Sequence, residues 1–536
     1  MKILALTLAL AGLAMGNTFA QVSTGNLPKL IEKNGRHQLL VDGKPFFILG
    51  GQVHNSSAWP GMMPRVWSAA EQLHLNTIEI PIYWEQVEPQ PGKFDFSSVD
   101  MLLTQARQHH VRLVLLWFGT WKNGSNHYMP AWMKQNSVKY PNITGKKDQP
   151  IDSPSPHNQA TLNADIKAFT AVMSHLKSAD VQHTVIMVQV ENETGSWGSV
   201  RDYSPVAQKL FESPVPQQML RPELLKALNR PTDSKGNWKD VFGDRADEYF
   251  QAWSIASYVG KVAAAGKAAY PLPLYVNAAL RDPLTNPAAE NYESGGPTDN
   301  VLPIWKVAAP AIDLEAPDIY LGGDKAISKV IDLYDRADNA LFVPETELSA
   351  EKAKYLFEVI AHGGIGFSPF GIDDNGSGEP KEKTAKNLRP FSEQYNVTAP
   401  MLPQLVQWGF EGKIIAVIEQ EDHANQVVDL GVWQAIVSFG IGDREQLQPN
   451  PAADGRLMIV QLSKDKFVLI GAGCHVVFKP AGKNAGKAWQ YLAVKEGSYE
   501  HGMFKQLRIW NGDETDWGGP HFGVKPTILE VSVIAR

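Results

Sequence analysis

Glu193 and Glu345 are the residues of this sequence whose type and surroundings best suit chemistry. Each comes shortly after an apolar run, which ends at Val190 in one case and at Val343 in the other. A protonated carboxyl group can donate a proton, and an ionised one can attack carbon or act as a base. Cleavage of a glycosidic bond uses two such groups, one on each side of the bond. We therefore expect Glu193 and Glu345 to face each other across one active site.

The two glutamates are expected to have different roles. Glu193 lies close in sequence to aromatic Trp197 and is assigned as the proton donor, which later serves as base, because apolar surroundings raise the pKa of a carboxyl group. Glu345 directly ends its apolar run and is assigned as the nucleophile. Strand alternation places Glu191 on the face of Glu193, and Glu347 on the face of Glu345. Periodicity alone therefore does not choose within either pair, and Glu347 remains a rival nucleophile.

An α/β fold, a (β/α)₈ TIM barrel, is the architecture expected to position these residues. Between about residues 46 and 374, short apolar runs alternate with longer amphipathic stretches. Continuous apolar runs are typical of parallel strands buried on both faces, and eight of them in βα alternation predict a closed barrel. Active sites of such barrels lie at the carboxyl ends of the strands. The expected strands are 46–50, 77–83, 111–118, 184–190, 274–277, 316–320, 341–345 and 364–370.

A doubly wound open sheet is the alternative α/β architecture. Such sheets usually carry a Gly-rich phosphate-binding turn after the first strand. Residues 49–54, with the sequence LGGQVH, match that pattern poorly, so the barrel is preferred. Two long polar insertions, at 124–160 and 199–240, are then expected at the barrel mouth, where they would shape the cleft.

Three parts of the chain are expected from its composition. Residues 1–20 read as a signal peptide, with Lys2 followed by an apolar run and a small residue, Ala20, before the cleavage point. The barrel is expected over residues 21–400. Short β-type runs punctuated by Gly, Asp and Pro predict a smaller all-β, sandwich-like accessory domain over residues 401–536. The protein is therefore expected to be exported, either to the periplasm or out of the cell.

Charge and cysteine content narrow the range of partners. The 536 residues carry a formal net charge of −7, which gives no reason to expect nucleic acid or an anionic membrane as partner. The single cysteine, Cys474, permits no intramolecular disulfide, and the sequence contains no Cys/His cluster of the kind that binds metals. We expect a carbohydrate substrate and no metal or cofactor. The sequence does not predict an oligomeric state.

Two motifs resemble those of a known family. Residues 76–89, NTIEIPIYWEQVEP, followed by GKFDF at 92–96, resemble the second-strand signature of glycoside hydrolase family 35. Residues 189–195, QVENETG, resemble the acid/base motif of that family, in which the glutamate after asparagine is the proton donor. That position is Glu193 here. The resemblance implies a retaining exo-β-galactosidase that removes terminal β-galactosyl residues from oligosaccharides or plant glycans.

The chain departs from the common family pattern in places that concern sugar selectivity. Thr194 stands where many members have tyrosine, and residues 117–123, WFGTWKN, stand where many have Ala-Glu-Trp. Another retaining β-glycosidase, such as a β-glucosidase, is therefore the nearest alternative. A carbohydrate-binding protein without catalysis is the alternative from another functional class.

The remaining expectations concern the sugar pocket. Asn192 is expected to hydrogen-bond the sugar 2-OH, and Tyr320 is expected to donate to Glu345. Aromatic rings can stack on sugar C–H groups, although they are as often buried in the core, and a lone histidine is more often structural than a ligand. The substrate-binding residues that we expect are Asn192, Tyr320, Tyr83, Trp117, Trp121 and His54.

Overall fold

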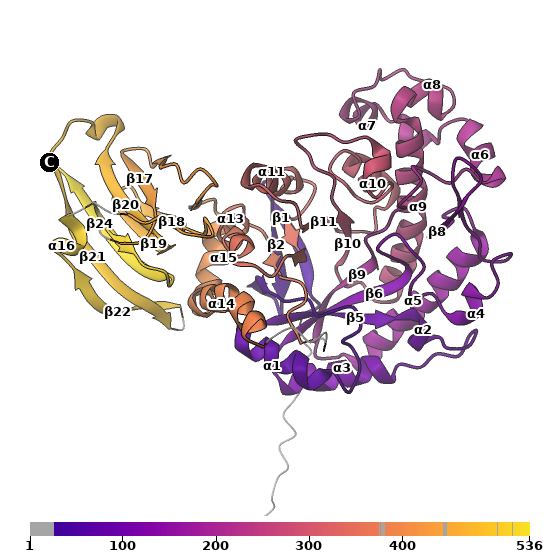
Figure 1. The fold of residues 1–536 in the computed structure, drawn as a ribbon, viewed down its shortest axis with the longest axis horizontal. Coiled ribbons are helices and arrows are strands. Elements are labelled where there is room, and N and C mark those ends of the chain that lie inside the picture. Colours follow the sequence, from indigo (N-terminus) through magenta and orange to yellow (C-terminus); the bar gives the residue numbers. More distant parts are fainter. Residues whose placement is uncertain (1–25, 375, 377–380, 443–446, 501, 517) are drawn as a thin grey trace, which may run out of the picture.

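A computed structural model describes residues 26–536, apart from 375, 377–380, 443–446, 501 and 517. The expected signal peptide at 1–20 lies outside the described residues. The chain forms an α/β barrel followed by a β-rich unit, which lie side by side (Figure 1). Helices α14 (Lys381–Thr398) and α15 (Leu402–Phe410) lie between the two parts.

The barrel contains a strand in each of the eight apolar runs that the sequence predicts. Parallel pairing gives the orders β13-β11-β10-β9-β6-β5 and β12-β14-β4, and bridges from Gln52 to Glu79 and Phe370 join the two sheets. Pro344, which has no N–H to donate, separates the two halves of the seventh run. The TIM-barrel prediction is therefore confirmed. The strands are β4 (Ile48–Leu49), β5 (Thr77–Tyr83), β6 (Arg112–Lys122), β9 (Val185–Asn192), β10 (Leu274–Ala279), β11 (Leu314–Ile319), β12 (Phe342–Val343), β13 (Glu345–Thr346) and β14 (Gly366–Phe367).

Helices cover the outside of the barrel, which explains why its strands are apolar throughout. Every residue of β5 and of β9 is buried, as expected for strands enclosed on both faces. The helices begin and end at ordinary signals: Asn158 caps α5 through a bond from the Thr161 N–H, and His74 ends α1 with a left-handed φ of 55°. The main covering helices are α1 (Met63–Leu73), α3 (Ser97–Gln108), α5 (Gln159–Ala179), α9 (Ala246–Ala269), α10 (Leu302–Ala308), α11 (Asp324–Tyr334) and α13 (Tyr355–Ala361).

The two long insertions form small elements of their own. The first carries α4 (Ala131–Lys134) and the antiparallel pair β7 (Asn142–Thr144) and β8 (Pro150–Pro154). The second carries α6 (Pro205–Glu212), α7 (Pro222–Ala227) and α8 (Trp238–Phe242). Helices α7 and α8 lie near one end of α9 in Figure 1, and α8 contacts it.

An antiparallel sheet precedes the barrel and was not expected from the sequence. It consists of β1 (Lys29–Lys33), β2 (Arg36–Val41) and β3 (Lys44–Phe46). Its turns use left-handed residues, with Gly35 at φ 75° and Gly43 at φ 76°. Arg36 donates from Nη1 to the Gly409 carbonyl at 2.9 Å, so this sheet is held against α15.

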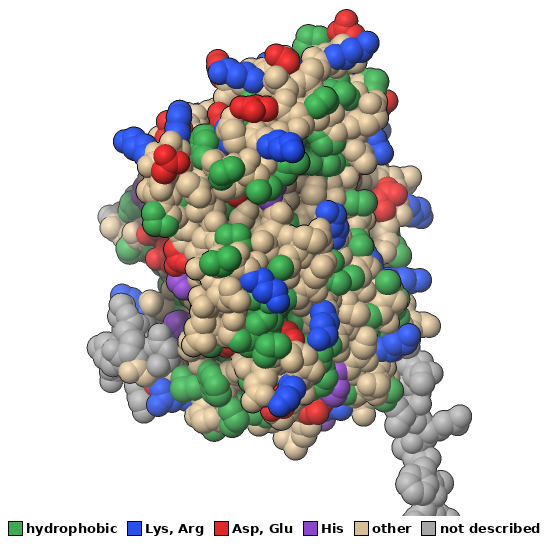
Figure 2. All heavy atoms as spheres, turned by 90° about the vertical axis from the view of Figure 1, so that its right-hand side faces the viewer, with side chains coloured by type: hydrophobic (Ala, Val, Ile, Leu, Met, Phe, Trp, Pro, Cys, Tyr) green, Lys and Arg blue, Asp and Glu red, His purple; other side chains and the backbone are tan. Residues whose placement is uncertain are grey.

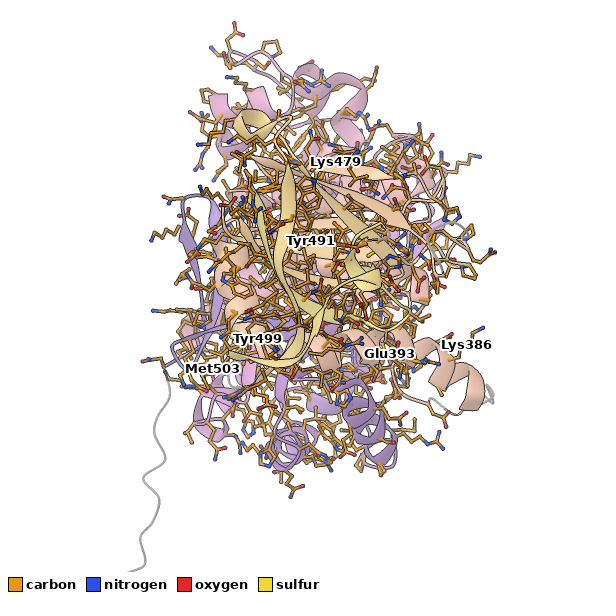
Figure 3. All side chains as sticks on the ribbon, turned by 90° about the vertical axis from the view of Figure 1, so that its left-hand side faces the viewer. Lys386, Glu393, Lys479, Tyr491, Tyr499 and Met503 are labelled. Atoms are coloured by element: carbon orange, nitrogen blue, oxygen red, sulfur yellow. The ribbon has the colours of Figure 1, made fainter. Side chains whose placement is uncertain are left out.

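The C-terminal unit consists of two antiparallel sheets, ordered β15-β18-β19-β24-β21-β22 and β16-β17-β20-β23. A second apolar core, which includes Trp433, Phe467 and Phe478, lies within it. Tyr491, near the middle of the unit in Figure 3, packs its ring edge-on against Phe478. An all-β unit after the barrel is thus confirmed. Its strands are β15 (Ile414–Ile418), β16 (Gln426–Asp429), β17 (Trp433–Phe439), β18 (Arg456–Ser463), β19 (Lys466–Ala472), β20 (Cys474–Pro480), β21 (Trp489–Glu500), β22 (Met503–Trp510), β23 (His521–Phe522) and β24 (Thr527–Ala535).

The main apolar core of the barrel continues into the C-terminal unit. The main cluster of buried side chains runs from the barrel helices into Ile414, Met458, Val468 and Tyr499 of the C-terminal sheets. Helix α13 contacts strand β15 directly. The C-terminal unit is therefore packed onto the barrel as part of one structure.

The surface carries charges of both signs. Lys, Arg, Asp and Glu side chains are interspersed over the face shown in Figure 2, as the small net charge suggests. Among the described residues, no helix combines the length and the apolar character that crossing a bilayer requires.

Lys354 connects the two parts through buried polar contacts. Its Nζ donates to the carbonyls of Glu419 at 2.6 Å and Ala453 at 2.9 Å, and it pairs with Asp324 at 2.8 Å. We predict that Lys354→Met lowers the free energy of unfolding by about 3–5 kcal/mol, because it leaves Asp324 buried without its cation. Urea denaturation measures this loss.

Exposed Lys325 is the matched control, since a surface Lys→Met change alters the free energy of unfolding by only about 0.5 kcal/mol. Equal stability of the two variants would contradict a structural role for the Lys354 contacts.

Candidate active site

Three acidic side chains meet at the carboxyl ends of the barrel strands. Glu193 directly follows β9, Asp318 lies near the end of β11, and Glu345 begins β13. One carboxyl oxygen from each lies within 4.8 Å of the others. The structure thus brings together Glu193 and Glu345, as expected, and adds Asp318, which the sequence reasoning missed.

Strand register and one amide side chain hold this cluster. Asp318 and Glu345 are direct partners in the parallel pairing of β11 with β13. Asn277, on the neighbouring strand β10, donates from Nδ2 to Asp318 Oδ2 at 2.6 Å and accepts the backbone N–H of Glu193 at 2.9 Å. Asn277 therefore fixes the two acids that flank Glu345.

Glu345 lies among hydrogen-bond donors. Its Oε1 accepts from Gln52 Nε2 at 2.8 Å, from Asn192 Nδ2 at 3.2 Å and more weakly from Asn277 Nδ2 at 3.4 Å. Its Oε2 accepts from the Tyr320 hydroxyl at 3.0 Å. Donated hydrogen bonds stabilise the ionised form of a carboxyl group, which is the form that can attack carbon.

Glu193 and Asp318 both have raised pKa values. Burial, and next the charge of Glu345, raises the pKa of Glu193 to about 7. Burial and the charges of Glu345 and Glu193 raise the pKa of Asp318 well above its ordinary value. These surroundings favour the protonated form of Asp318, and the interaction of Asp318 with Glu193 lowers the pKa of Glu193. Glu193 is in turn protonated in part of the molecules near neutral pH, as a general acid requires.

Lys122 supplies positive charge at the same place. It ends strand β6 and is buried, and its Nζ donates to Asn192 Oδ1 at 2.7 Å and to the side-chain oxygen of Asn123. Its charge lowers the pKa values of Glu193 and Asp318 and so opposes the effect of burial. Lys122 lies in the segment WFGTWKN, which departs from the common family pattern, but the sequence alone predicted no role for it.

The backbone separates Glu191 from Glu193, so the expected alternation is wrong at this point. Both residues have left-handed φ angles, 64° at Glu191 and 42° at Glu193, which break the extended strand geometry. Glu191 accepts the Trp121 N–H at 2.8 Å and bonds to Asp165. Burial, and next the charge of Asp165, raises the pKa of Glu191 well above its ordinary value.

Glu347 also lies apart from the cluster. Strand β13 ends at Thr346, whose hydroxyl donates to the Ile319 carbonyl at 2.9 Å, and Glu347 beyond it is exposed. Of the two candidate nucleophiles, Glu345 and Glu347, only Glu345 lies in the acidic cluster, so the geometry favours Glu345.

The expectation that Trp117 and Trp121 bind the substrate is wrong. Both side chains are fully buried, and each indole N–H is already bonded: Trp117 to Asp165 at 3.0 Å and Trp121 to Ser153 at 3.2 Å. Both side chains pack in the core, which was the alternative to stacking on a sugar. Trp197, with 51% of its surface exposed, is the tryptophan of this region that faces outward.

Tyr83 and His54 hold the loop that follows the first strand. Tyr83 is buried, donates to the Asn55 carbonyl at 2.7 Å and stacks on Tyr128 at 5.2 Å. His54 is bonded to Asp373 through Nδ1 at 3.1 Å and through its backbone N–H at 2.9 Å. Tyr83 was expected to bind the substrate, but its side chain is buried. His54 was also expected to bind the substrate, and its bonds to Asp373 instead give it a structural role.

Comparison with known proteins finds family matches over two parts of the chain. Residues 38–229 match the model of glycosyl hydrolases family 35, and residues 391–520 match a domain of unknown function, DUF5597. The beta-galactosidase of Xanthomonas manihotis is 30% identical over 182 residues, which cover 31% of this chain and 27% of that protein. The beta-galactosidase of Homo sapiens is 29% identical over 191 residues, or 33% of this chain and 25% of that protein. The chain thus spans only about a quarter of the length of these relatives.

Solved structures support the architecture. The crystal structure of a beta-galactosidase from Bacillus circulans sp. alkalophilus aligns with a TM-score of 0.51 and 10% identity, covering 91% of this chain and 99% of that one. At this identity the likeness concerns the fold alone. Over residues 38–229, which contain β4, β5, β6, β9 and Glu193, the sequence matches glycosyl hydrolases family 35.

Proposed function

We propose that this protein is a retaining exo-β-galactosidase that removes terminal β-galactosyl residues from oligosaccharides or plant glycans. The observation that carries the proposal is the approach of Glu193 and Glu345 oxygens to within 4.8 Å. Retaining glycosidases hold their carboxyl groups about 5–5.5 Å apart, whereas inverting enzymes leave a wider gap for water. The choice of galactose is supported by the beta-galactosidases that the barrel resembles in sequence.

In the first step, Glu345 attacks the anomeric carbon as the glycosidic C–O bond breaks. Glu193 transfers its proton to the departing oxygen, so the leaving sugar departs as an alcohol and Glu345 holds the galactosyl group as an ester. The donors around Glu345 favour its ionised form, and the raised pKa of Glu193 favours a proton at the required place.

In the second step, ionised Glu193 takes a proton from water as the water oxygen attacks the anomeric carbon. The ester bond breaks, Glu345 leaves as a carboxylate, and two inversions give overall retention. Asn192 is proposed to hydrogen-bond the sugar 2-OH, because Lys122 holds its side-chain oxygen while its amide nitrogen faces Glu345.

The direct test uses the purified full chain. We predict hydrolysis of 4-nitrophenyl β-galactoside with kcat/KM about tenfold or more above that of the matching β-glucoside. Proton NMR during the reaction should show β-galactose before mutarotation. Initial release of α-galactose would contradict retention, and a preference for the glucoside would replace galactose as the glycone.

Glu345→Gly tests the nucleophile. We predict a loss of kcat by about four orders of magnitude or more, since no group remains to form the ester. Azide should restore turnover with an activated aryl galactoside and give the α-galactosyl azide. Glu347→Gly is the matched control and should keep wild-type kcat, because Glu347 is exposed outside the cluster. Azide rescue at Glu347 in place of Glu345 would overturn the assignment.

Glu193→Ala tests the general acid through pH and leaving group. With a pKa of about 7, Glu193 loses its proton as pH rises, so wild-type kcat/KM should fall through an alkaline limb near pH 7. Glu193→Ala should remove that limb. It should slow alkyl galactosides far more than 4-nitrophenyl galactoside, whose leaving group needs little protonation. Equal losses on both substrates would contradict the role.

A further inference from the structure

A polar hollow lies beyond the acidic cluster, among the insertions and the loop that follows β10. It consists of two neighbouring cavities of about 710 and 520 Å³, which share Lys146, Tyr203, Asp244 and Asp247 as lining residues. Residues 286–290 form part of the lining of the larger cavity. The mechanism proposed above uses none of these side chains.

A short series of contacts connects the proposed acid/base residue with the hollow. The Gly124 N–H donates to the Glu193 carbonyl at 2.9 Å, and a side chain on Gly124 would meet both Glu293 and Trp197. Exposed Trp197 is followed directly by Gly198, which lines the larger cavity. Residues in direct contact or adjacent in the chain therefore link Glu193, Trp197 and the rim of the hollow.

One wall of the hollow is fixed to the first turn of α9 through Asp247. Arg201 forms an ion pair with Asp247 and donates from Nη2 to Gln208 at 2.8 Å. The Tyr203 ring lies over the Arg201 guanidinium, with 3.9 Å between the ring centroid and Cζ. Tyr203 is half-buried, so this contact holds its ring in place at the edge of the hollow.

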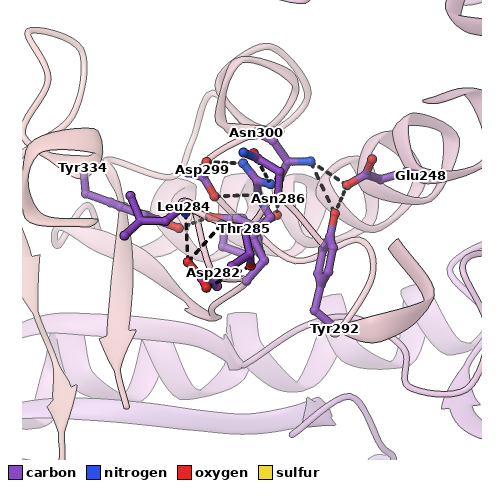
Figure 4. A network of polar contacts seen from close by, with 12 residues as sticks. Glu248, Asp282, Leu284, Thr285, Asn286, Tyr292, Asp299, Asn300 and Tyr334 are labelled. Atoms are coloured by element: carbon purple, nitrogen blue, oxygen red, sulfur yellow. Dashed lines mark hydrogen bonds and ion pairs between the residues drawn. The ribbon is translucent and has the colours of Figure 1, made fainter. Parts of the chain in front are cut away.

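The other wall is fixed to the next residue of the same helix, Glu248. Asn300 donates to Glu248 at 2.6 Å, and the Tyr292 hydroxyl also bonds to it (Figure 4). Arg281 holds the same loop by donating to both oxygens of Asp299 at 2.7 and 2.5 Å and to Asn286 at 2.9 Å. Contacts within the chain thus hold both walls, which reduces the entropy lost when a ligand binds.

The lining favours a neutral, hydroxyl-rich ligand. It combines Lys146 and Lys147 with Asp244 and Glu290, so no single sign of charge dominates, in contrast to a nucleic-acid site. Few apolar side chains line it, which argues against a lipid. An aromatic ring held among polar groups is the arrangement that can stack on sugar C–H faces while hydrogen-bonding hydroxyls.

We infer that this hollow binds the oligosaccharide leaving group, the glycan from which terminal galactose is removed. The inference rests on the proposed function and adds sugar-binding subsites formed by Tyr203 and the 286–290 loop. The enzyme would then select substrates by the branched or extended glycan that follows the galactose.

Ala288→Trp tests the inference with little risk to folding, because Ala288 is an exposed loop residue that lines the hollow. The larger side chain should lower kcat/KM about tenfold on extended galactosyl oligosaccharides and leave 4-nitrophenyl β-galactoside unchanged. Ala485→Trp, at an exposed site of the C-terminal unit, is the matched control and should change neither. Tyr203→Ala should reproduce the selective loss, and Tyr203→Phe should keep the stacking ring and most of the rate.

The substrates are a panel of β-galactosyl-terminated plant oligosaccharides, from disaccharides to branched chains. The inference is supported if wild-type kcat/KM rises with aglycone size and Ala288→Trp abolishes the rise. It is overturned if size has no effect across the panel, or if Ala288→Trp slows the aryl galactoside equally. A wild-type protein inactive on the aryl galactoside would instead refute the proposed function, and this inference with it.

Discussion

Repulsion among buried carboxyl groups is the constraint on which this site depends. Glu193, Asp318 and Glu345 place oxygens within 4.8 Å of one another, so all three cannot be ionised together at acceptable free energy. The structure resolves this by giving them different surroundings. Glu345 receives side-chain hydrogen bonds, burial raises the pKa of Asp318 well above its ordinary value, and the pKa of Glu193 is raised to about 7 with Lys122 close by. The proposed division of labour between acid and nucleophile follows from this separation.

Closure of the barrel makes that arrangement possible, because the donors come from strands far apart in the chain. Gln52 reaches Glu345 from beyond the first strand and also bridges to Glu79 and Phe370. Asn192 and Asn277 reach it from the fourth and fifth strands. The C-terminal unit shares the apolar core of the barrel helices, so the same packing that joins the two parts supports the ring of strands.

The strands and the principal carboxyl pair were predictable because both depend on local pattern. Continuous apolar runs mark enclosed parallel strands, and a carboxylate at the end of such a run lies at the barrel mouth. Asp318, Asn277 and Lys122 were missed because their importance comes from lateral register between strands, which one sequence does not contain. The turn of Glu191 away from Glu193 depends on left-handed φ angles at non-glycine residues, and no alternation pattern signals them. Trp117 and Trp121 were misplaced because aromatic character suits a core and a cleft equally.

Asp247 and Glu248, which hold the two walls of the hollow, are neighbours in helix α9, and this affects how the substrate range of the enzyme can change. Both walls of the hollow are attached to one turn of a surface helix, whereas the carboxyl cluster is attached to the strands. Mutations at the tips of the 144–149 or 286–290 loops can therefore accumulate without disturbing the reacting groups. Selection on new substrates can act on these loops while the bond-breaking chemistry is inherited unchanged.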